Sequence, residues 1–585
     1  KINDIGMNFF KNVLASLLGL IIFSFLFFMI LIVIASAGEG EETVNVEPSS
    51  ILYLKLSGVL QERTTEDPLK DLFPEAVMPE IGLHDLVSVI QHSKEDERIK
   101  GIYLDHQLLN GGFASLKEVR DALIDFKVSG KTIYAYGEYL SEGDYYLASA
   151  ADAFFMHPEG SLEFNGLMAN ITFFKGLFDK LEVKSEIFRV GTFKSAVEPF
   201  LRKDMSPENR LQYTSLLSAI YDIYLTDVAQ SRNIQKVDLS RYSKDLLVQV
   251  PEDAYRLGLV DSLGYKDELK SLIASDLEIE EVSEVSFITY QNYKNSYKDK
   301  YAKDKIAVIY ANGSIVMAGD DTQIVGYKLA KEIRKARENK SVKAIVLRIN
   351  SPGGSLVASD LIWHEVSLTK GVKPIIASMA DVAASGGYYI AMACDTIIAQ
   401  PNTITGSIGI FGMWFNFEQL LENRFGITHD VVKTGDHSDL YTVTRNLTDF
   451  ERSVIQKGVN KGYQTFITKA AEGRGVTPEA IDKVGSGRVW SGSQALDNGL
   501  VDIIGNFDDA IALAVALSGV EGAYRIVNYP AQKSMFEKLL GSVTNEIMIS
   551  NQMTSEVMAP YLKQIKALQE MKGIQARMTE DLSIH

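Results

Sequence analysis

Ser407 is the side chain of this sequence best placed to act as a nucleophile. It lies in the segment 405–409 (Thr-Gly-Ser-Ile-Gly), inside an otherwise apolar run. The flanking Gly406 and Gly409 would let backbone amides and a substrate carbonyl come close without interference from a Cβ atom. Taken alone, the segment is equally compatible with a glycine-rich turn between buried strands. A nucleophilic role therefore requires a base and an oxyanion site elsewhere in the chain.

The candidate base is Lys194, which lies far upstream in segment 191–200 (Gly-Thr-Phe-Lys-Ser-Ala-Val-Glu-Pro-Phe). A lysine acts as a base only when its amine is neutral, and burial lowers its pKa from the usual value of about 10.4. The neighbours of Lys194 are mostly apolar, which favours burial. The alternative interpretation is a surface lysine paired with Glu198, and Lys433 is a weaker rival for the role of base.

A glycine pair supplies a candidate oxyanion site. Residues 350–355 (Asn-Ser-Pro-Gly-Gly-Ser) follow the apolar run 344–349. A strand that ends in two glycines can present free N–H groups to a developing negative charge. We expect the oxyanion to be held by the amides of Gly354 and Ile408, with Gly353 as the alternative to Gly354.

Composition excludes several classes of function. The chain has 585 residues and is 46% hydrophobic, enough for more than one core. A net charge of −17 argues against a nucleic-acid partner, which needs a basic surface. The one cysteine, Cys394, excludes an intrachain disulfide and a cysteine-rich zinc site. We expect neither a metal nor a cofactor.

Residues 13–37 contain no charged side chain and are long enough to cross a hydrocarbon core of about 30 Å. Lysines precede this segment and glutamates follow it, so residues 1–12 are expected in the cytoplasm and the rest outside it. The alternative is a cleaved signal peptide, with residues 35–37 (Ala-Ser-Ala) at the cleavage site. We favour an uncleaved anchor, which places the chain in the inner (cytoplasmic) membrane as a single-pass protein with a periplasmic catalytic part and lipid contacts through this helix.

The sequence after residue 37 predicts an α/β fold of two tandem repeats, because apolar strands alternate with helical patterns. The segment 145–152 resembles 388–395 at a spacing of 243 residues, and 258–264 resembles 499–505 at 241. The expected units are a linker over 38–50, repeat 1 over 51–290 with the lysine, a linker over 291–305, repeat 2 over 306–530 with the serine, and a helical C-terminal extension over 531–585.

The two repeats complement each other. At the spacing of 243, Ser407 corresponds to Phe164, and Lys194 corresponds to about His437. Each half therefore lacks the residue that the other keeps. This pattern predicts one composite site per chain, built from both repeats.

These motifs, together with residues 381–389 (Asp-Val-Ala-Ala-Ser-Gly-Gly-Tyr-Tyr), resemble the long, two-repeat form of the signal peptide peptidase A (protease IV) family, within the ClpP and crotonase-like superfamily. The resemblance covers nearly everything after residue 37. It implies ClpP/crotonase-like β-α-β repeats, Ser407 as nucleophile and Lys194 as general base. It also implies a homotetramer that hydrolyses signal peptides left in the membrane, without ATP or metal.

Three alternatives remain. Ser385 resembles the nucleophile segment of ClpP, but Ile408 stands where the partner histidine would be expected, and His429 and His437 lie in no matching motif. A non-catalytic membrane scaffold would be favoured by the loss of Ser407 or Lys194, and both are present. A crotonase-like acyl-CoA enzyme would also suit the glycine pair, but not the pairing of a serine with a lysine.

Overall fold

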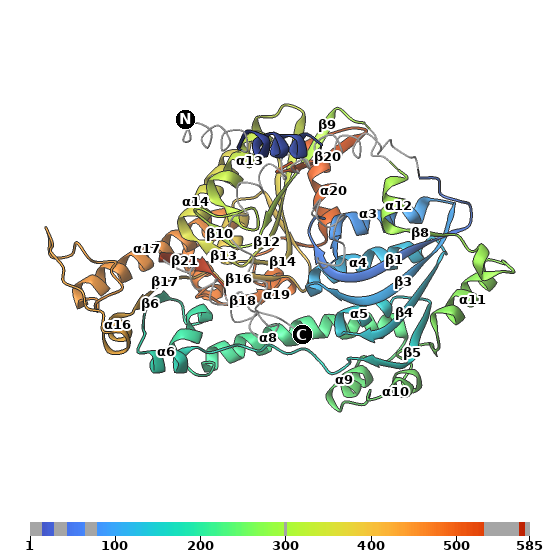
Figure 1. The fold of residues 1–585 in the computed structure, drawn as a ribbon, viewed down its shortest axis with the longest axis horizontal. Coiled ribbons are helices and arrows are strands. Elements are labelled where there is room, and N and C mark those ends of the chain that lie inside the picture. Colours follow the sequence, from blue (N-terminus) through green and yellow to red (C-terminus); the bar gives the residue numbers. More distant parts are fainter. Residues whose placement is uncertain (1–13, 28–43, 65–78, 298–300, 532–572, 579–585) are drawn as a thin grey trace, which may run out of the picture.

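The computed structural model describes residues 14–27, 44–64, 79–297, 301–531 and 573–578. Two parallel sheets lie side by side, one from each half of the chain (Figure 1). The first sheet has the order β2-β1-β3-β4-β5-β7, with β8 on β1. Its strands are β1 (Ser50–Gln61), β2 (Glu80–Gly82), β3 (Ile99–Asn110), β4 (Thr132–Leu140), β5 (Ala153–Leu162), β7 (Ser262–Leu263) and β8 (Phe287–Thr289).

The second sheet repeats this design with the order β18-β16-β14-β12-β9-β20, and with β15 on β14 and β19 on β15. Its strands are β9 (Asp304–Asn312), β12 (Val342–Ser351), β14 (Ile375–Ala384), β15 (Thr396–Ala399), β16 (Ile404–Gly406), β18 (Val489–Ser491), β19 (Ile503–Ile504) and β20 (Tyr524–Tyr529). The central strands are buried on both faces, as expected for parallel strands covered by helices.

Helices cover both sheets. Those of the first half are α3 (Leu83–Glu95), α4 (Phe113–Lys127), α5 (Glu142–Ala148), α6 (Lys175–Leu181), α7 (Glu198–Leu201), α8 (Pro207–Arg232), α9 (Lys236–Lys244), α10 (Pro251–Arg256), α11 (Lys266–Asp276) and α12 (Tyr290–Asn295), with 3-10 turns η2 (Ser195–Val197) and η3 (Val282–Glu284). Those of the second half are α13 (Gly326–Glu338), α14 (Leu356–Thr369), α15 (Gly386–Ala391), α16 (Glu418–Phe425), α17 (Asp449–Arg474), α18 (Pro478–Val484), α19 (Gly492–Asp497) and α20 (Phe507–Ser518).

The duplicated segments make the same contacts in both halves. The Tyr145 hydroxyl donates to the Leu259 carbonyl at 3.1 Å, and the Tyr388 hydroxyl donates to the Leu500 carbonyl at 3.0 Å. The long helices α8 and α17 each have 26 residues and lie at equivalent places in the two halves. The α/β repeat architecture predicted from the sequence is therefore confirmed.

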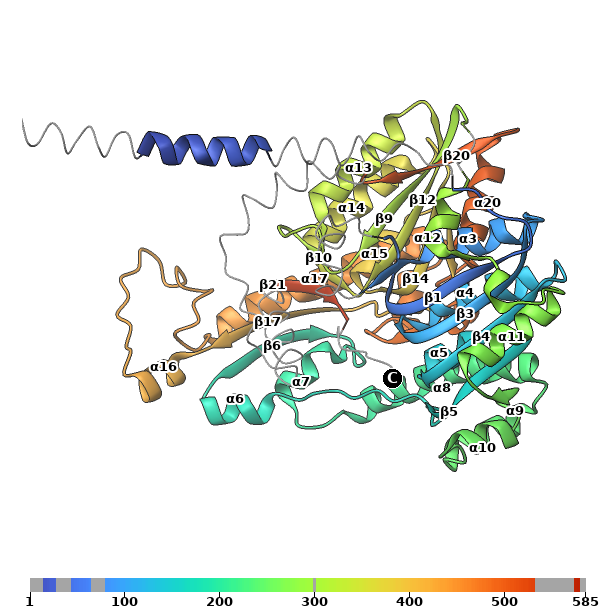
Figure 2. The ribbon, with the colours of Figure 1, turned by 45° about the vertical axis from the view of Figure 1, so that its right-hand side comes forward.

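A third, smaller sheet joins the halves. Its order is β11-β10-β13-β21-β17-β6, with strands β6 (Lys184–Val190), β10 (Ile315–Val316), β11 (Ile324–Val325), β13 (Gly353–Ser355), β17 (Ile410–Asn416) and β21 (Gly573–Arg577). β6 comes from the first half and runs antiparallel to β17 of the second (Figure 2). The segment of the first half that carries Lys194 therefore lies against the serine-bearing half.

Two predicted units need correction. Residues 291–295 were expected to begin a linker but belong to α12, because Tyr293 is buried in the core of the first half. Residues 573–577 were expected to belong to a helical extension but form the strand β21, whose backbone is paired on both sides. The rest of that extension, 532–572 and 579–585, lies outside the described residues.

The predicted membrane span 13–37 lies largely outside the described residues. Residues 14–27 are helical and their side chains are exposed. Of the parts of the chain that the structure describes, no helix has the length and apolar character needed to span a bilayer.

Candidate active site

The structure brings Lys194 and Ser407 together in one chain. The Lys194 Nζ lies 3.1 Å from the Ser407 Oγ and 3.1 Å from the Ser407 carbonyl oxygen. It also lies 2.8 Å from the Oγ of Ser385. The surface alternative for Lys194 is therefore wrong, because this side chain is buried and its partners are two hydroxyls and a carbonyl.

Burial determines the charge of Lys194. Desolvation lowers the pKa of its amine well below the usual value, because the protonated form loses its hydration in this site. A neutral amine has two N–H donors and one lone pair. The Ser407 carbonyl can only accept, so one N–H serves it, and the second N–H and the lone pair are left for the two hydroxyls. A neutral Lys194 therefore accepts a hydrogen bond from one serine hydroxyl while donating one to the other.

The loop that carries Lys194 is held against the serine-bearing half by close backbone contacts. The Phe193 amide donates to the Ser486 carbonyl at 2.9 Å. Gly487 has φ +81°, and a Cβ there would lie 2.5 Å from the Lys194 nitrogen. Only a residue without a side chain allows this approach. The loop 485–488, which no sequence motif singled out, thus positions Lys194.

Helix α8 supports the same loop through Gln212. Its Nε2 donates to the Ser195 Oγ at 2.8 Å, and its Oε1 accepts from the Val489 amide at 3.3 Å. Ser195 therefore contacts Gln212 rather than orienting the Lys194 amine. Glu198, the expected surface partner of the lysine, instead accepts hydrogen bonds from Ser206 and Asn209.

Both serines occupy left-handed backbone positions, which non-glycine residues rarely adopt outside functional or tightly constrained sites. Ser407 has φ 49° and follows β16, and its amide donates to the Arg488 carbonyl at 2.7 Å. Ser385 has φ 56° and links β14 to α15. Ser385, weighed in the sequence as a rival nucleophile, is thus a member of the same cluster.

The predicted oxyanion residues lie beside this cluster. The Gly353 amide donates to the Ser351 Oγ at 3.2 Å, so this donor is already engaged. Gly354 has φ +155° and pairs with Ile315 of β10. Ile408 is buried, and its carbonyl accepts from the Gly487 amide at 2.8 Å.

The remaining candidates lie elsewhere. Lys433 is exposed and donates to Asp439 at 2.8 Å. His437 contacts Glu451. Phe164, the counterpart of Ser407, is buried in the aromatic core of the first half. The first half also has a glycine pair, Gly111 and Gly112, and a Cβ on Gly112 would overlap the carboxyl group of Asp381.

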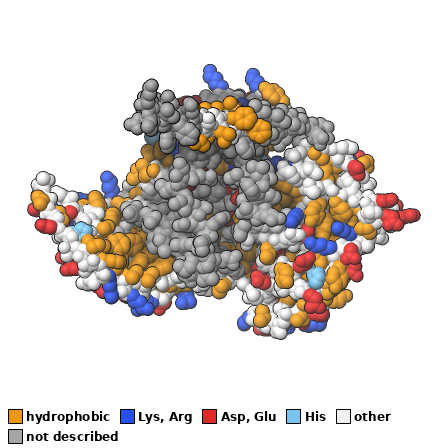
Figure 3. Space-filling model, in the orientation of Figure 1, with side chains coloured by type: hydrophobic (Ala, Val, Ile, Leu, Met, Phe, Trp, Pro, Cys, Tyr) orange, Lys and Arg blue, Asp and Glu red, His pale blue; other side chains and the backbone are white. Residues whose placement is uncertain are grey.

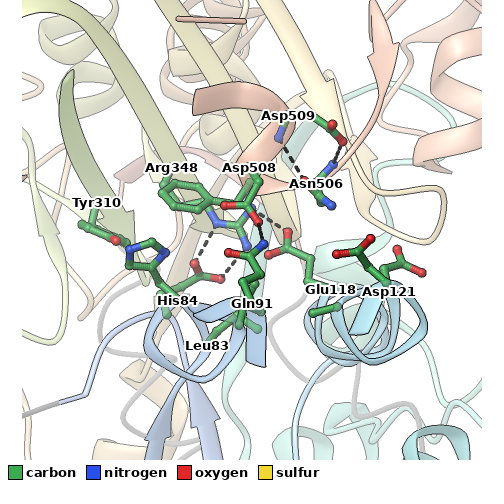
Figure 4. A pocket seen from close by; sticks show the side chains of 15 residues that line it. Leu83, His84, Gln91, Glu118, Asp121, Tyr310, Arg348, Asn506, Asp508 and Asp509 are labelled. Atoms are coloured by element: carbon green, nitrogen blue, oxygen red, sulfur yellow. Dashed lines mark hydrogen bonds and ion pairs between the residues drawn. The ribbon is translucent and has the colours of Figure 1, made fainter. Parts of the chain in front are cut away.

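A cavity of about 160 Å³ lies between the halves and contains none of the predicted site residues (Figure 4). Arg348 points into it and binds Glu62 and Glu118 at 2.7 and 2.9 Å. These two buried ion pairs join β12 to α4 and to the residue that follows β1. The acidic lining of the cavity belongs to the interface between the repeats rather than to the serine cluster.

Comparisons with known proteins identify the family of this chain. The profile of Peptidase family S49 matches residues 125–280 and 367–521, and that of Clp protease matches 297–407. Protease 4 of Salmonella typhi is 35% identical over 565 residues, covering 92% of this chain and 89% of that protein. Protease 4 of Haemophilus influenzae is 35% identical over 519 residues, 86% of this chain and 84% of that protein. A chloroplastic serine protease SPPA of Arabidopsis thaliana is 33% identical, covering 80% of this chain and 69% of that protein. The chain therefore belongs to peptidase family S49, in its two-repeat form, and is a serine peptidase.

Proposed function

We propose that Ser407 is the nucleophile and Lys194 the general base of a membrane-anchored endopeptidase that cleaves residual signal peptides and other unfolded, hydrophobic peptides. The observation that carries this proposal is the buried Lys194 amine 3.1 Å from the Ser407 hydroxyl. A desolvated lysine with a lowered pKa can remove a serine proton near neutral pH.

The contact between Lys194 and Ser407 supports the first step of the proposed reaction. Lys194 Nζ takes the Ser407 proton as Oγ attacks the peptide carbonyl, and the amides of Gly354 and Ile408 bind the resulting oxyanion. The protonated Lys194 then gives its proton to the departing amine, leaving an acyl group on Ser407. Water, deprotonated by Lys194, attacks this ester, and Lys194 then returns the proton to the departing Ser407 Oγ, which releases the acid product. Ser385 accepts a hydrogen bond from the Lys194 amine and acts as a residue that positions this amine.

The choice between the two serines is tested with a fluorophosphonate probe on the full-length protein. Ser407→Ala should abolish labelling and peptide hydrolysis. Ser385→Ala should retain labelling at Ser407, with turnover reduced roughly tenfold to a hundredfold because Lys194 loses one partner. Labelling that survives in Ser407→Ala and is lost in Ser385→Ala would assign the nucleophile to Ser385.

The proposed substrates are argued from the apolar residues that follow Ser407 in the chain. Ile410, Phe411 and Met413 are buried along the strand that leaves Ser407. We expect small or apolar residues around the scissile bond and poor cleavage of folded proteins. A library of unfolded peptides, read by mass spectrometry, would contradict this if charged residues dominated beside the cut.

We also propose the inner membrane as the location, with the catalytic part in the periplasm. The uncharged segment 13–37 supports this. The tests are fractionation with and without detergent and protease accessibility in intact cells and spheroplasts. Release in salt alone, or protection of the catalytic part after the outer membrane is opened, would contradict the assignment.

A homotetramer is the third element of the proposal. Exposed apolar side chains gather at the end of the molecule that carries α16 (Figure 3). They are Leu177, Leu181, Phe425, Ile427, Val431, Val432 and Tyr441. Patches of this kind mark contact surfaces in soluble domains. Light scattering in detergent should give four copies for the wild type and fewer for Val432→Lys; a monomeric wild type would contradict it.

A further inference from the structure

Helix α4 of the first repeat is capped by side chains of the second repeat. Gly112 is its N-cap residue and has no side chain that could accept from the free amides of the first turn. The Asp381 carboxylate instead accepts hydrogen bonds from the Ser115 amide at 2.8 Å and from the Ser115 hydroxyl at 2.6 Å. The Asn402 side-chain amide donates to the Phe113 carbonyl at 2.9 Å. The first turn of α4 is therefore held by two residues from the other repeat.

The contact with Asp381 is close and electrostatically favourable. A Cβ on Gly112 would overlap the Asp381 carboxyl group, so a glycine is needed at this position. A carboxylate at a helix N-terminus interacts favourably with the helix dipole. Burial raises the pKa of Asp381, and the two hydrogen bonds from Ser115 oppose that shift. Loss of this carboxylate would leave the Ser115 amide without its acceptor.

The two capping residues precede the two serines that contact Lys194. β14 carries Asp381 and leads into Ser385. Asn402 comes just before β16, which leads into Ser407. The Lys194 amine lies 2.8 Å from the Ser385 Oγ and 3.1 Å from the Ser407 Oγ. The contacts with α4 therefore hold the ends of both strands that present the serines to the base.

β14 and β16 are also bound to each other at this end. Their last three residues form parallel pairs. The Thr403 hydroxyl donates to the Ala380 carbonyl at 2.7 Å, and the Thr405 hydroxyl donates to the Ala383 carbonyl at 2.8 Å. A shift of either strand would therefore move both serines.

Helix α4 is fixed in the core of the first repeat, because Leu116, Val119 and Leu123 on its inner face are buried there. The loop that carries Lys194 comes from the same repeat. The capping contacts thus attach the repeat that carries the base to the strands that carry the serines. This attachment is separate from the one that loop 485–488 makes with the lysine loop.

We propose that Asp381 and Asn402 are positioning residues for the peptidase reaction, which align the two serines with Lys194 through the first turn of α4. They act through β14 and β16 and not by contact with the reacting atoms. This inference rests on the proposed function and names further residues on which the same site depends. Misalignment by about 1 Å can cost roughly a hundredfold in rate. Because the alignment is needed in the transition state, its loss should lower kcat and kcat/KM equally.

The test compares Asp381→Ala with a matched control on the same strand, both in the full-length protein. The control is Asp395→Ala, because the Asp395 carboxylate accepts from the amide of Ile375 at the opposite end of β14, at 2.9 Å. Both variants should unfold at a lower temperature than the wild type. We expect kcat to fall about tenfold or more only for Asp381→Ala, with KM within twofold of the wild type. Equal decreases in kcat for the two variants would overturn the inference.

Two milder variants cover the case in which Asp381→Ala fails to fold. Asp381→Asn keeps an acceptor for the Ser115 amide, and its kcat should stay within about threefold of the wild type. Ser115→Ala removes one of the two hydrogen bonds, and its kcat should fall about twofold to fivefold. Where Asp381→Ala folds, adding Ser115→Ala to it should cause no further loss, because both changes remove the same contact. Independent, multiplying losses would overturn the inference.

The wild-type assays separate this inference from the proposed function. A wild type without peptide hydrolysis and without fluorophosphonate labelling at Ser407 would reject the proposed function and the inference with it. An active wild type, together with unchanged kcat in Ser115→Ala and Asn402→Ala, would reject the inference alone. We expect instead that Asn402→Ala lowers kcat about threefold to tenfold. Intact mass should show slower labelling in this variant, still at Ser407.

Discussion

Lys194 and Ser407 lie 213 positions apart in sequence, and their side-chain nitrogen and oxygen lie 3.1 Å apart. The distance is short because the chain after β5 leaves the first half, pairs β6 with β17 of the second half, and turns at Lys194. The lysine reaches the serine within one chain. Neither repeat could assemble this pair alone.

Lys194→Met should abolish hydrolysis and change how stability depends on pH. In the unfolded chain the lysine binds a proton at neutral pH, whereas burial lowers the pKa of Lys194 in the folded chain. Between the lowered value and about 10.4 the unfolded state binds more protons, so the free energy of unfolding of the wild type rises with pH. The methionine variant should lose this rise and unfold at a higher temperature near pH 7.

Thermal unfolding between pH 6 and 10 measures this difference, with the exposed Lys433→Met as the control. Lys433→Met should follow the wild type and retain activity. If Lys194→Met and the wild type showed parallel unfolding curves across the whole range, Lys194 would be charged in the folded protein and could not serve as the base.

The rate of fluorophosphonate labelling should follow the neutral fraction of Lys194. Because burial lowers the pKa of this amine, the rate should rise with pH and level off well below the usual lysine range near 10.4. Stopped reactions over pH 5 to 10, read by intact mass, give the profile. A rate that still rises tenfold per pH unit at pH 9.5 would contradict a depressed pKa.

Residue types and repeat spacing were sufficient to predict the fold class and to single out Ser407 and Lys194. The absence of each residue from the opposite repeat was the decisive signal. The sequence did not predict that Ser385 shares Lys194, because a hydrogen bond at 2.8 Å depends on the corner between β14 and α15. Such corners follow from packing rather than from local pattern.

The sequence also did not predict where two backbone segments approach each other closely. Gly487 and Gly112 each stand where a Cβ would collide with another segment, Lys194 in one case and Asp381 in the other. No spacing rule links these pairs. The pairing of β21 was missed for a related reason. Residues 573–577 form a strand because they pair with β13 on one side and β17 on the other, and both strands are far away in sequence.

Gly487→Ala should impair catalysis without unfolding the protein. Gly487 has φ +81°, and the added Cβ would lie 2.5 Å from the Lys194 nitrogen, so the lysine loop must shift. Displacing a general base by about 1 Å can cost roughly a hundredfold in rate. The control is Gly475→Ala, at φ +65° in open space after α17, which carries the same conformational cost without the collision.

The two glycine variants are compared by kcat and by thermal unfolding. We expect the unfolding temperature to decrease for both variants, because both alanines adopt a left-handed conformation, and to decrease more for Gly487→Ala, whose Cβ also meets the lysine loop. We expect a loss of kcat only for Gly487→Ala. Equal kcat values would show that the loop 485–488 does not position Lys194.

The last prediction concerns Glu118, which holds the repeats together through Arg348. Burial raises the pKa of Glu118 to about 7, although Arg348 opposes the shift. Between about 4.5 and 7 the folded protein therefore binds a proton that the unfolded chain releases, and the free energy of unfolding falls as pH rises. Over this window a single carboxyl contributes at most about 3 kcal/mol.

Glu118→Gln removes this titration and keeps a hydrogen-bonding side chain beside Arg348. Its unfolding temperature should decrease less between pH 5 and 8 than that of the wild type, whereas the exposed Glu97→Gln should behave like the wild type. If Glu118→Gln lost activity at every pH and showed the wild-type decrease in stability, Glu118 would be ionised throughout and the ion pair with Arg348 would be permanent.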